Sequence, residues 1–564
     1  MAYDLKREPW IPWRRRSGAV EWGPPALLVD RLEDDPVVAL VAPRADFDGA
    51  LQEFLIGLLT ASLQPPDERA WKALWTRPPS REALQAALDA LPPAFDLDGE
   101  GPRFFQDLSP VDFADTEPGT VDQLLIDTPG DQTLRLNKDL FVKRERVGRL
   151  GRPAAAMAIL TLQTYAPAGG QGHRTSLRGG GPLATLVDPR VDDEGRWRAH
   201  ERPLWYKLWA NVETWAQWDD RTPPGAPTSF DAGFPWLSPT RSSGKASGVK
   251  TTPSDAHPIQ IYFGLPRRIR LEFGGPGRCD LTGVEDERTV TGFRMRNYGV
   301  QYAAWRHPLS PHYRQKVDSE WLPVHGQPGG LAWRDWLALT LRAPAGGLRE
   351  PAATVAAFNR RGASVGLMSY RLHAFGYDMD NMKARGWTDA TLPAFVVADE
   401  QREALLRNTA EALTDAAGIA ASALLGAVKA TLFQSPDDAS RDLSQVRADL
   451  WAATERAFYE TMRVIAAPTL DIDQAIETAT VRKKMFALAL RDDALEVFDR
   501  WCPAAGLAPA ALRRRVTARY NLTMALSGIS KLGEKMFDAL GIPLPGGGHA
   551  ARASKKRARK EAVE

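Results

Sequence analysis

Glycine and arginine gather in one short stretch of this chain, residues 165–187, which reads YAPAGGQGHRTSLRGGGPLATLV. Six glycines within 169–181 surround His173, Arg174 and Arg178. Glycine lets a partner approach the backbone closely and adopts positive φ, and arginine pairs with anions. The combination therefore indicates an anionic ligand held by the backbone, such as a phosphate chain. The same composition is equally typical of a wide surface turn, and both interpretations stay open.

Neither of the two familiar phosphate-binding loops matches this stretch. A Walker loop needs Lys and then Ser or Thr after its second glycine, whereas Gly172 is followed by His173 and Arg174. The dinucleotide fingerprint needs three glycines that open a helix after a strand, and Gly170, Gly172 and Thr175 break that triplet. The stretch therefore carries no nucleotide-hydrolysis signature.

Candidates for metal or acid–base chemistry are sparse. His307 and His312 are the closest histidine pair, but prolines lie between them and no cysteine is near, so we expect a structural role. Asp378 and Asp380 stand two residues apart and could help bind a metal, yet the sequence signals no third ligand. Because no nucleophile elbow or kinase-type loop is present either, we expect no enzyme activity, no cofactor and no metal site.

Basic residues gather in further segments. Residues 132–152 contain seven Arg or Lys against two acidic residues, a composition suited to tracking a phosphate backbone. Clusters at 482–484 and 513–515 lie within helical patterns, where they form a second basic surface or only keep the helices soluble. Four closely spaced tryptophans offer stacking surfaces, although this spacing is more typical of a core: Trp205, Trp209, Trp215 and Trp218.

Composition restricts the class of protein. The chain has 564 residues, 44% hydrophobic and 25% charged, which is typical of a soluble globular protein of several domains. Because the net charge is only +2, any nucleic-acid binding has to come from local patches. Cys279 and Cys502 provide neither a four-cysteine zinc site nor a disulfide framework, which predicts a cytoplasmic location. No apolar stretch approaches the length of a membrane span, so no membrane association is expected.

The elements that must position these residues change in character along the chain. Over 1–397, short apolar runs with frequent proline and glycine predict a mixed α+β domain. Within it we expect helices at 51–63 and 81–91 and a strand, turn and strand at 259–273. Residues 222–258 are rich in Pro, Ser, Thr and Gly and predict a long exposed connection.

The C-terminal part of the chain has long helical periods instead. Four segments carry apolar residues at three- and four-residue steps, separated by short turns: 399–433, 437–466, 471–501 and 509–540. This pattern predicts an antiparallel four-helix bundle over 398–545. Residues 546–564 include RASKKRARK without apolar periodicity and predict a basic disordered tail.

Several landmarks occur in the order found in one known family. They are PWIPW near the start, RFFQDL at 103–108, the glycine-rich stretch, FGLPRRIRLEF at 263–273, TGFRMRNY at 291–298 and GYDMDNMKARGW at 376–387. Together they resemble the large subunit, also called CasA, of the type I-E CRISPR surveillance complex Cascade, over nearly the whole chain. The resemblance implies a mixed N-terminal domain followed by a four-helix bundle.

The same resemblance implies a noncatalytic role in antiviral defence. Members of this family recognise a short protospacer-adjacent motif (PAM) in double-stranded DNA from the minor groove, with a glycine loop, a basic finger and a wedge that starts R-loop formation. The corresponding residues are Gly169, Gly170, Gly172, His173 and Arg174 in the loop, Arg294 or Arg296 in the finger, and Asp380, Asn381 and Met382 in the wedge. A narrow minor groove admits a backbone without side chains, and its degenerate pattern predicts tolerance of several PAM sequences.

The resemblance also implies partners for the basic segments. Residues that would anchor the 5′ handle of the guide RNA (crRNA) and the capping subunit are Lys143, Arg144, Arg146, Arg149 and Arg152. Residues of the bundle that would hold the displaced non-target strand are Arg482, Lys483, Lys484, Arg513, Arg514 and Arg515. Backbone and small subunits and a separate helicase–nuclease complete the implied partners, and guide pairing reads the target sequence.

Two other functions stay open from the residues themselves. Asp378 and Asp380 would suit a metal-dependent enzyme that acts on nucleic acid, and the basic segments alone would suit a scaffold that only binds RNA. Some members of the family carry a cysteine-rich zinc site before the finger. With only Cys279 in that region, this chain lacks such a site.

Overall fold

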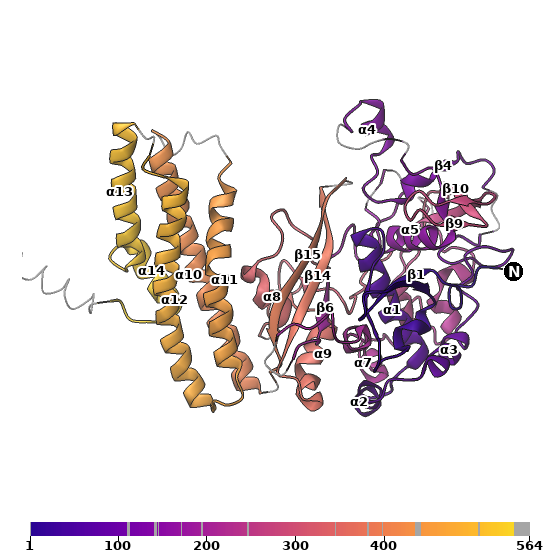
Figure 1. Ribbon diagram of the computed structural model, residues 1–564, viewed down its shortest axis with the longest axis horizontal. Helices are drawn as coiled ribbons and strands as arrows, with labels where there is room; N and C mark the ends of the chain where they lie inside the picture. The colour runs from indigo at the N-terminus through magenta and orange to yellow at the C-terminus, as the bar shows by residue number, and fades with distance from the viewer. Residues whose placement is uncertain are drawn as a thin grey trace, which may run out of the picture. The chain divides into compact units, whose positions relative to one another are not determined.

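The chain folds into two compact units, Met1–Gly330 with Ala338–Val396, and Leu331–Leu337 with Val397–Glu564. The computed structural model describes residues 2–109, 113–139, 144, 146–167, 169–170, 172–192, 196–244, 248–344, 346–380, 383–397, 399–434, 442–505 and 508–545. Strands and helices mix in the first unit and long helices form the second, which confirms the α+β class (Figure 1).

Small antiparallel sheets organise the first unit. They are β2 (Val20–Gly23), β1 (Ile11–Arg15) and β3 (Val37–Leu40); β4 (Gly119–Thr120), β10 (Thr289–Arg296) and β5 (Leu150–Gly151), with β7 (Arg268–Phe273) also paired to β10; β12 (Leu322–Pro323), β11 (His312–Tyr313) and β13 (Arg349–Glu350); β15 (Lys383–Phe395), β14 (Ser369–Asp380) and β6 (Ala184–Asp188); and β8 (Gly277–Arg278) with β9 (Glu285–Asp286). Strands β14 and β15 form a long hairpin that pairs through β14 with β6.

Most of the helices upstream of residue 397 belong to the same unit as these sheets. They are α1 (Ala45–Leu63), α2 (Glu68–Thr76), α3 (Arg81–Asp89), α4 (Asp131–Arg135), α5 (Arg152–Tyr165), α6 (Leu204–Ala210), α7 (Trp215–Asp219), α8 (Trp336–Thr340) and α9 (Ala353–Arg361). Short 3-10 turns are η1 (Pro25–Val29), η2 (Val121–Leu124), η3 (Phe230–Gly233), η4 (Pro235–Leu237), η5 (Pro258–Tyr262), η6 (Trp333–Asp335) and η7 (Gly362–Val365).

Helix α1 lies at the centre of the first unit's core. Its residues are apolar nearly all round, which suits a helix that is buried on every side. Phe54 packs edge-to-face against Trp10 and Phe104, with ring centroids 5.6 Å apart in each pair. A Cβ at Gly57 would lie 2.6 Å from Tyr262 Cβ, so the helix approaches its neighbour closely at that glycine.

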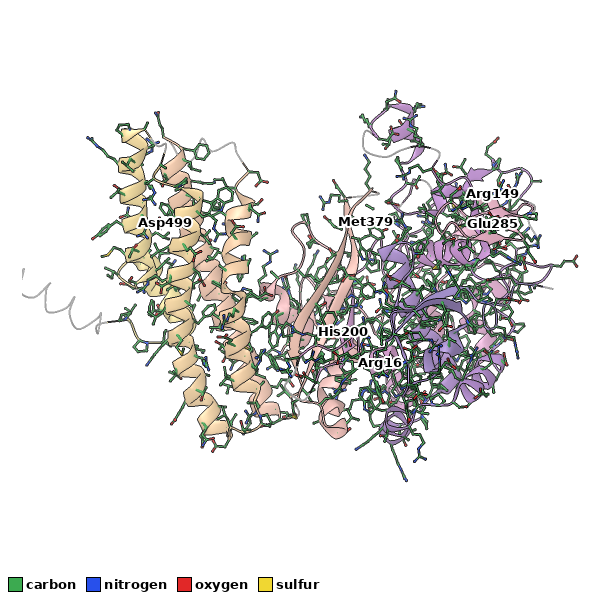
Figure 2. The ribbon with its side chains drawn as sticks, viewed as in Figure 1. Arg16, Arg149, His200, Glu285, Met379 and Asp499 are labelled. Carbon is green, nitrogen blue, oxygen red and sulfur yellow. The ribbon has the colours of Figure 1, made fainter. Side chains whose placement is uncertain are left out.

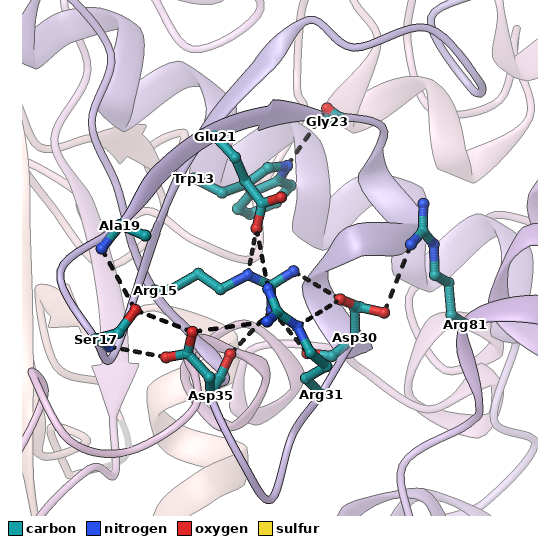
Figure 3. Close-up of polar contacts among 10 residues, drawn as sticks. All are labelled: Trp13, Arg15, Ser17, Ala19, Glu21, Gly23, Asp30, Arg31, Asp35 and Arg81. Carbon is teal, nitrogen blue, oxygen red and sulfur yellow. Dashed lines mark hydrogen bonds and ion pairs between the residues drawn. The ribbon is translucent and has the colours of Figure 1, made fainter.

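A buried arginine holds the N-terminal hairpin in place (Figure 3). Arg15 of β1 is 2% exposed and pairs with Glu21 of β2 and, over 2.6 Å, with Asp30. Its Nη1 also donates to the Asp35 carbonyl over 2.9 Å, and Asp35 accepts the backbone N–H of Ser17 over 2.8 Å. A buried charge is tolerated only when it is paired, so this arginine serves the fold.

Two expectations for the middle of the chain need correction. The helices at 51–63 and 81–91 are confirmed as α1 and α3, but residues 259–262 belong to the 3-10 turn η5 and only β7 is a strand. Pro258 favours a helical turn there because its φ is preset, and the His257 side chain accepts the first N–H. The segment 222–258 is not exposed throughout, since Phe234 and Trp236 are fully buried.

The second unit consists of α10 (Glu400–Leu432), α11 (Ser444–Ala466), α12 (Ile472–Trp501), α13 (Pro509–Leu526) and α14 (Lys531–Leu540), and α10 contacts all the others. The helix expected at 509–540 is divided into α13 and α14, because Gly528 adopts φ +77° and Ser530 caps a new helix. Residues 331–337 also join this unit, where Trp333 stacks on Phe458 at 4.5 Å.

One expectation about membranes also changes. Helix α10 is long and apolar enough to cross a membrane by length and composition, so the view that no segment reaches that length is wrong. Half of its most apolar window is buried among the other helices, as in a core helix. Length and composition alone are weak grounds for a membrane span.

Candidate nucleic-acid interface

The first half of the glycine loop, defined here as residues 169–183, packs against the end of strand β10. Tyr298 donates its backbone N–H to the Gly172 carbonyl over 2.8 Å. Gly172 has φ +84°, and a Cβ built there would lie 2.7 Å from the Cβ of Asn297. Because an L side chain suits neither this backbone conformation nor this space, position 172 requires glycine.

The second half of the glycine loop packs against strand β14. A Cβ at Gly181 would lie 2.7 Å from Tyr377 Cβ and 2.8 Å from Met379 Cγ, and Met379 is near the end of β14 (Figure 2). A Cβ at Gly179 would lie 2.9 Å from His325 Cε1. The loop therefore contacts both the strand that carries the predicted finger and the hairpin that carries the predicted wedge.

Gly170 differs from the other glycines of the loop. Its φ is +72°, and a Cβ built there meets no atom within 4 Å. At Gly169, by contrast, a Cβ would lie 3.0 Å from His173 Nδ1. Contacts inside the protein thus explain the glycines at 169, 172, 179 and 181, whereas at position 170 a side chain would extend into open space.

Both arginines of the glycine loop use their guanidinium groups inside the protein. Arg174 donates from Nε to Ser243 Oγ and from Nη2 to the Ser243 carbonyl, each over 2.7 Å. Arg178 is buried and pairs with Glu53 of α1. The anionic-ligand interpretation of this stretch therefore does not extend to Arg178, because its charge is already paired with Glu53 in the core.

The histidines of this region are neutral at physiological pH. Burial lowers the pKa of His173, and the Arg267 guanidinium lowers it further. Burial also lowers the pKa of His325, and Arg178 adds to that effect. A neutral imidazole has one donor and one acceptor nitrogen, so each ring is suited to a directed hydrogen bond.

Strand β10 presents both candidate finger residues on one face. Arg294 and Arg296 are two residues apart and point to the same side, whereas Met295 points to the other. Arg294 pairs with Glu272, and Arg296 pairs with Asp115. The Asp115 side chain is 69% exposed and that of Glu272 is 39% exposed. A phosphate oxygen can therefore replace Asp115 as the partner of Arg296 more easily than it can replace Glu272 as the partner of Arg294.

The β14–β15 hairpin that carries the predicted wedge is anchored a few residues below its tip, where Tyr377 pairs with Trp387. The Tyr377 hydroxyl donates to Asp46 of α1 over 2.6 Å. Trp387 of β15 packs edge-to-face on Tyr165 with ring centroids 5.4 Å apart. Asp380 is the last residue of β14 and is exposed, whereas Asn381 and Met382 lie outside the described residues. The hairpin thus extends from a rigid core toward the predicted wedge.

The carboxylates proposed for metal chemistry have a cation partner. Asp378 pairs with Arg385 over 2.6 Å, and the same arginine lies 3.9 Å from Asp380. Within the described part of the chain, no group of three or more His, Cys, Asp or Glu side chains is placed to hold a metal ion. The arginine supplies the positive charge that a metal would otherwise bring to these two aspartates.

Two aspartates pin the segment that was predicted to anchor the guide RNA. Asp280 accepts the backbone N–H groups of Gly148 and Arg149, each over 2.8 Å. Asp286 accepts the backbone N–H of Arg152 over 2.7 Å and its Nε–H over 2.9 Å. Arg152 therefore holds the start of α5, while the Arg149 side chain is exposed (Figure 2).

The remaining basic residues of that segment lie further upstream. Arg144 pairs with Asp139 over 2.6 Å and donates to Asn137 Oδ1 over 3.0 Å, so it binds within its own turn. Arg146 is exposed, and Lys143 lies outside the described residues.

The bundle carries its predicted basic positions on two helices. On α12, Lys484 is exposed, whereas Arg482 and Lys483 are half-buried. On α13, Arg513 is exposed. The two following arginines make contacts within the bundle: Arg514 with the Thr431 carbonyl over 3.4 Å and Arg515 with Asp499 over 2.6 Å.

Residues that were expected to be structural lie in the core. Trp205 and Trp209 are fully buried and stack at 5.1 Å, which confirms packing over base stacking for this pair. His307 and His312 are buried, and burial lowers the pKa of His312 to about 3. Both histidines are therefore neutral, and a structural role for them stays a prediction.

Comparison with known protein families shows the family to which this chain belongs. The family model described as CRISPR-associated protein Cse1 matches residues 4–491. The chain belongs to the Cse1 family. It is thus a large subunit of the type I-E CRISPR class, which confirms the resemblance in its sequence landmarks. No curated protein sequence matches the chain.

Solved structures share the fold of this Cse1-family chain. Thermobifida fusca Cse1 has a TM-score of 0.68 at 18% identity, with 96% of this chain and 98% of that chain covered. Acidimicrobium ferrooxidans Cse1 has a TM-score of 0.61 at 19% identity, with 95% and 99% covered. A chain of a CRISPR RNA-guided surveillance complex has a TM-score of 0.62 at 18% identity, with 92% and 99% covered.

Sequence reasoning missed the residues that hold the glycine loop. Asn297 and Tyr298 close over Gly172, Ser243 binds Arg174, and His325 covers Gly179. These partners lie far along the chain from the loop. Asn297 and Tyr298 end the landmark TGFRMRNY, but that motif did not indicate a contact with the loop. The stretch HGQPGG that begins at residue 325 has the Gly and Pro content of a turn, and this is the local signal that could have drawn attention to His325.

Proposed function

We propose that this Cse1-family protein recognises the PAM of double-stranded DNA from the minor groove and starts R-loop formation. The observation that carries the proposal is the contact of one glycine loop with both β10 and the β14–β15 hairpin. A minor groove about 6 Å wide admits a bare backbone more easily than a side chain. Gly170 is the glycine best suited to enter it, since position 170 faces open space.

The finger and the wedge follow from the same arrangement. Arg296, whose partner Asp115 is exposed, neutralises a backbone phosphate beside the groove, and Arg294 supports it from the same face. Asp380, Asn381 and Met382 at the end of the hairpin separate the first base pairs. Insertion of side chains between base steps costs a few kcal/mol. The contacts that anchor the hairpin near its tip help to keep the wedge in place against that cost.

The partners of the protein follow from its family and its other basic segments. The similar chain named as part of a CRISPR RNA-guided surveillance complex supports assembly with guide RNA and other subunits. Arg146 and Arg149 are exposed and suit the guide RNA handle. Lys484 and Arg513 suit the displaced strand. A separate helicase–nuclease then cuts the DNA, and the assembly works in the cytoplasm.

We further propose that the chain itself performs no catalysis. Asp378 and Asp380 share Arg385, which competes with any metal for their charge. A rival nuclease function would require metal-dependent DNA cleavage by the purified chain that is lost in Asp378→Ala and Asp380→Ala. We expect no cleavage beyond that of a buffer control with added Mg²⁺ or Mn²⁺.

The test uses the guide-loaded complex reconstituted with and without this chain on DNA targets that differ only in the PAM. Gly170→Asn fills the open space, and asparagine tolerates positive φ, so the variant should fold. Its matched control is Gly225→Asn, because Gly225 has φ +83° and a Cβ there also meets no atom within 4 Å.

We expect PAM-dependent binding only when the chain is present. Gly170→Asn should weaken binding to the correct PAM at least tenfold, and Gly225→Asn should bind like the unmodified chain. Binding that ignores the PAM, or equal behaviour of both variants, would overturn the proposal for the glycine loop.

A further inference from the structure

A short segment, Val324 to Gly326, lies between the glycine loop and the wedge hairpin. On one side, Leu183 donates its N–H to the Val324 carbonyl over 2.9 Å, and His325 forms a β-bridge with Pro182. On the other side, Gly326 forms a parallel bridge with Asp378 of β14. The segment thus joins two elements that are distant in the sequence.

The His325 side chain makes the contact with the loop specific. Its Nδ1 lies 2.9 Å from the Gly180 carbonyl, and a carbonyl only accepts, so Nδ1 carries the proton. Because His325 Cε1 would lie 2.9 Å from a Cβ at position 179, the imidazole edge occupies the space that Gly179 leaves. The ring therefore meets two successive glycines, one by a hydrogen bond and the other by close packing.

The contact with the hairpin is equally close. A Cβ at Gly326 would lie 2.7 Å from the Tyr377 carbonyl oxygen, so only glycine brings the two backbones together. Tyr377 is held in turn by its hydroxyl bond to Asp46. Gly181 packs on the same tyrosine, with a built Cβ 2.7 Å from Tyr377 Cβ. Loop, segment and hairpin thus share one anchored residue.

We propose that His325 is a positioning residue that sets the glycine loop in register with the wedge hairpin, so that PAM contact at Gly170 places the hairpin tip at the first base pair. This inference rests on the proposed function and adds a residue outside its loop, finger and wedge. His325 makes no contact with DNA in this role. It acts through the Gly180 carbonyl and the backbone beside it.

Three variants separate the hydrogen bond of His325 from its bulk. His325→Asn retains a side-chain N–H close to the position of Nδ1, whereas His325→Leu retains volume without a donor. His325→Gln places its amide nearer the position of Nε2. His200→Leu is the control for a changed histidine, because the His200 side chain is 73% exposed.

The first measurement compares PAM-duplex binding with opening of the first base pairs in the reconstituted complex, read by 2-aminopurine fluorescence. Loss of one hydrogen bond that sets a geometry should slow opening about tenfold in His325→Leu and His325→Gln. Binding should fall less than threefold in both. His325→Asn and His200→Leu should open DNA within threefold of the unmodified chain. Equal losses of binding and opening, or normal opening by His325→Leu, would overturn the inference.

The second measurement needs no DNA and therefore separates this inference from the proposed function. In the full chain alone, His325→Leu should raise amide exchange at residues 181–183 and at 377–379 together, while His325→Asn should not. Gly326→Ala should loosen 377–379 and leave 181–183 protected. If the complex shows no PAM dependence but amide exchange rises at both 181–183 and 377–379 in His325→Leu, the positioning role of His325 is supported and the proposed DNA function is wrong. If amide exchange rises only at 181–183 in His325→Leu, the positioning role of His325 is wrong.

Discussion

The glycine loop and the handle segment, residues 144–152, are both rich in glycine and arginine, yet they are held by different means. In the loop, residues that follow β10, residues of β14 and the segment at 324–326 occupy the space beside three glycines: Gly172, Gly179 and Gly181. In the handle segment, two aspartates of the β8–β9 region bind backbone N–H groups. Steric fit shapes the loop, and hydrogen bonds to carboxylates shape the handle segment.

This difference shows that the same composition serves two purposes. Glycine at positions 172, 179 and 181 is required because neighbouring side chains leave no room for a Cβ. Arginine in the handle segment is held through its backbone at Arg149, so that its side chain stays exposed. The two regions should therefore respond to different substitutions, and each of the following changes affects one region and spares the other.

The largest effect is expected for Gly172→Ala. A Cβ would be strained at φ +84° and would lie 2.7 Å from Asn297 Cβ, which together cost about 2–4 kcal/mol. The melting temperature should fall by several degrees, and PAM binding should be lost while guide RNA binding persists. Gly170→Ala shares the positive φ without the contact and should cost about 1 kcal/mol. Equal melting temperatures of the two variants would contradict steric control of the loop.

Asp280→Ala should produce the next largest effect, in the handle segment. It removes two solvent-exposed hydrogen bonds, from the N–H groups of Gly148 and Arg149 to a carboxylate, which together contribute about 1 kcal/mol. Affinity for the guide RNA handle should fall about tenfold, measured by electrophoretic mobility shift, with PAM discrimination unchanged once the complex forms. Glu287→Ala removes the same charge nearby and is the control. A similar loss in both variants would mean that charge, and not the backbone contact, matters.

A smaller effect is expected when Arg296, the predicted finger residue, loses its acidic partner. Asp115→Asn removes the acidic partner of Arg296, and an exposed pair contributes about 0–1 kcal/mol. Duplex DNA affinity should therefore rise by up to about fivefold at low salt, with weaker PAM discrimination because the gain is independent of sequence. Asp318→Asn at another exposed position controls for net charge. A decrease in affinity would argue that Asp115 positions the finger.

The smallest effect concerns pH. The pKa of His325 and that of His173 are lowered in the folded loop, so the opened state binds protons first as the pH falls below about 6.5. Stability of the loop should therefore decrease with acidification, while the handle segment keeps its charge because arginine stays protonated. Amide exchange at pH 7.5 and 5.5, corrected for the intrinsic rate, should show a loss of protection at 172–183 beyond that at 148–152. Equal losses in both regions would contradict the difference.

Much of the architecture was predictable from local patterns. The helices α1 and α3 and the long helices of the second unit follow from apolar spacing, and the order of landmarks indicated the Cse1 family. Local patterns failed where a single residue redirects the chain. Pro258 turns a predicted strand into the 3-10 turn η5, and Gly528 divides a predicted helix.

The candidate site was predictable only in part. The glycine loop, β10 and the hairpin were each marked by their own residues, but nothing in those residues showed that Arg178 pairs with Glu53 in the core. The pairing joins residues more than a hundred positions apart, and its strength depends on burial that only packing creates. An arginine beside glycine in the sequence thus indicated an external ligand, whereas in the structure Arg178 pairs with a carboxylate of the protein's own core.

The sequence by itself determined the class of fold and the approximate positions of the long helices of the second unit, because these depend on the periodicity of apolar residues within a few turns. Only the tertiary structure decided what approaches each glycine and which arginines remain exposed. Those outcomes depend on contacts such as Gly172 with Asn297 and Gly180 with His325, which form when distant segments pack together. Packing depends on many segments at once, so it cannot be predicted from any single stretch of the chain.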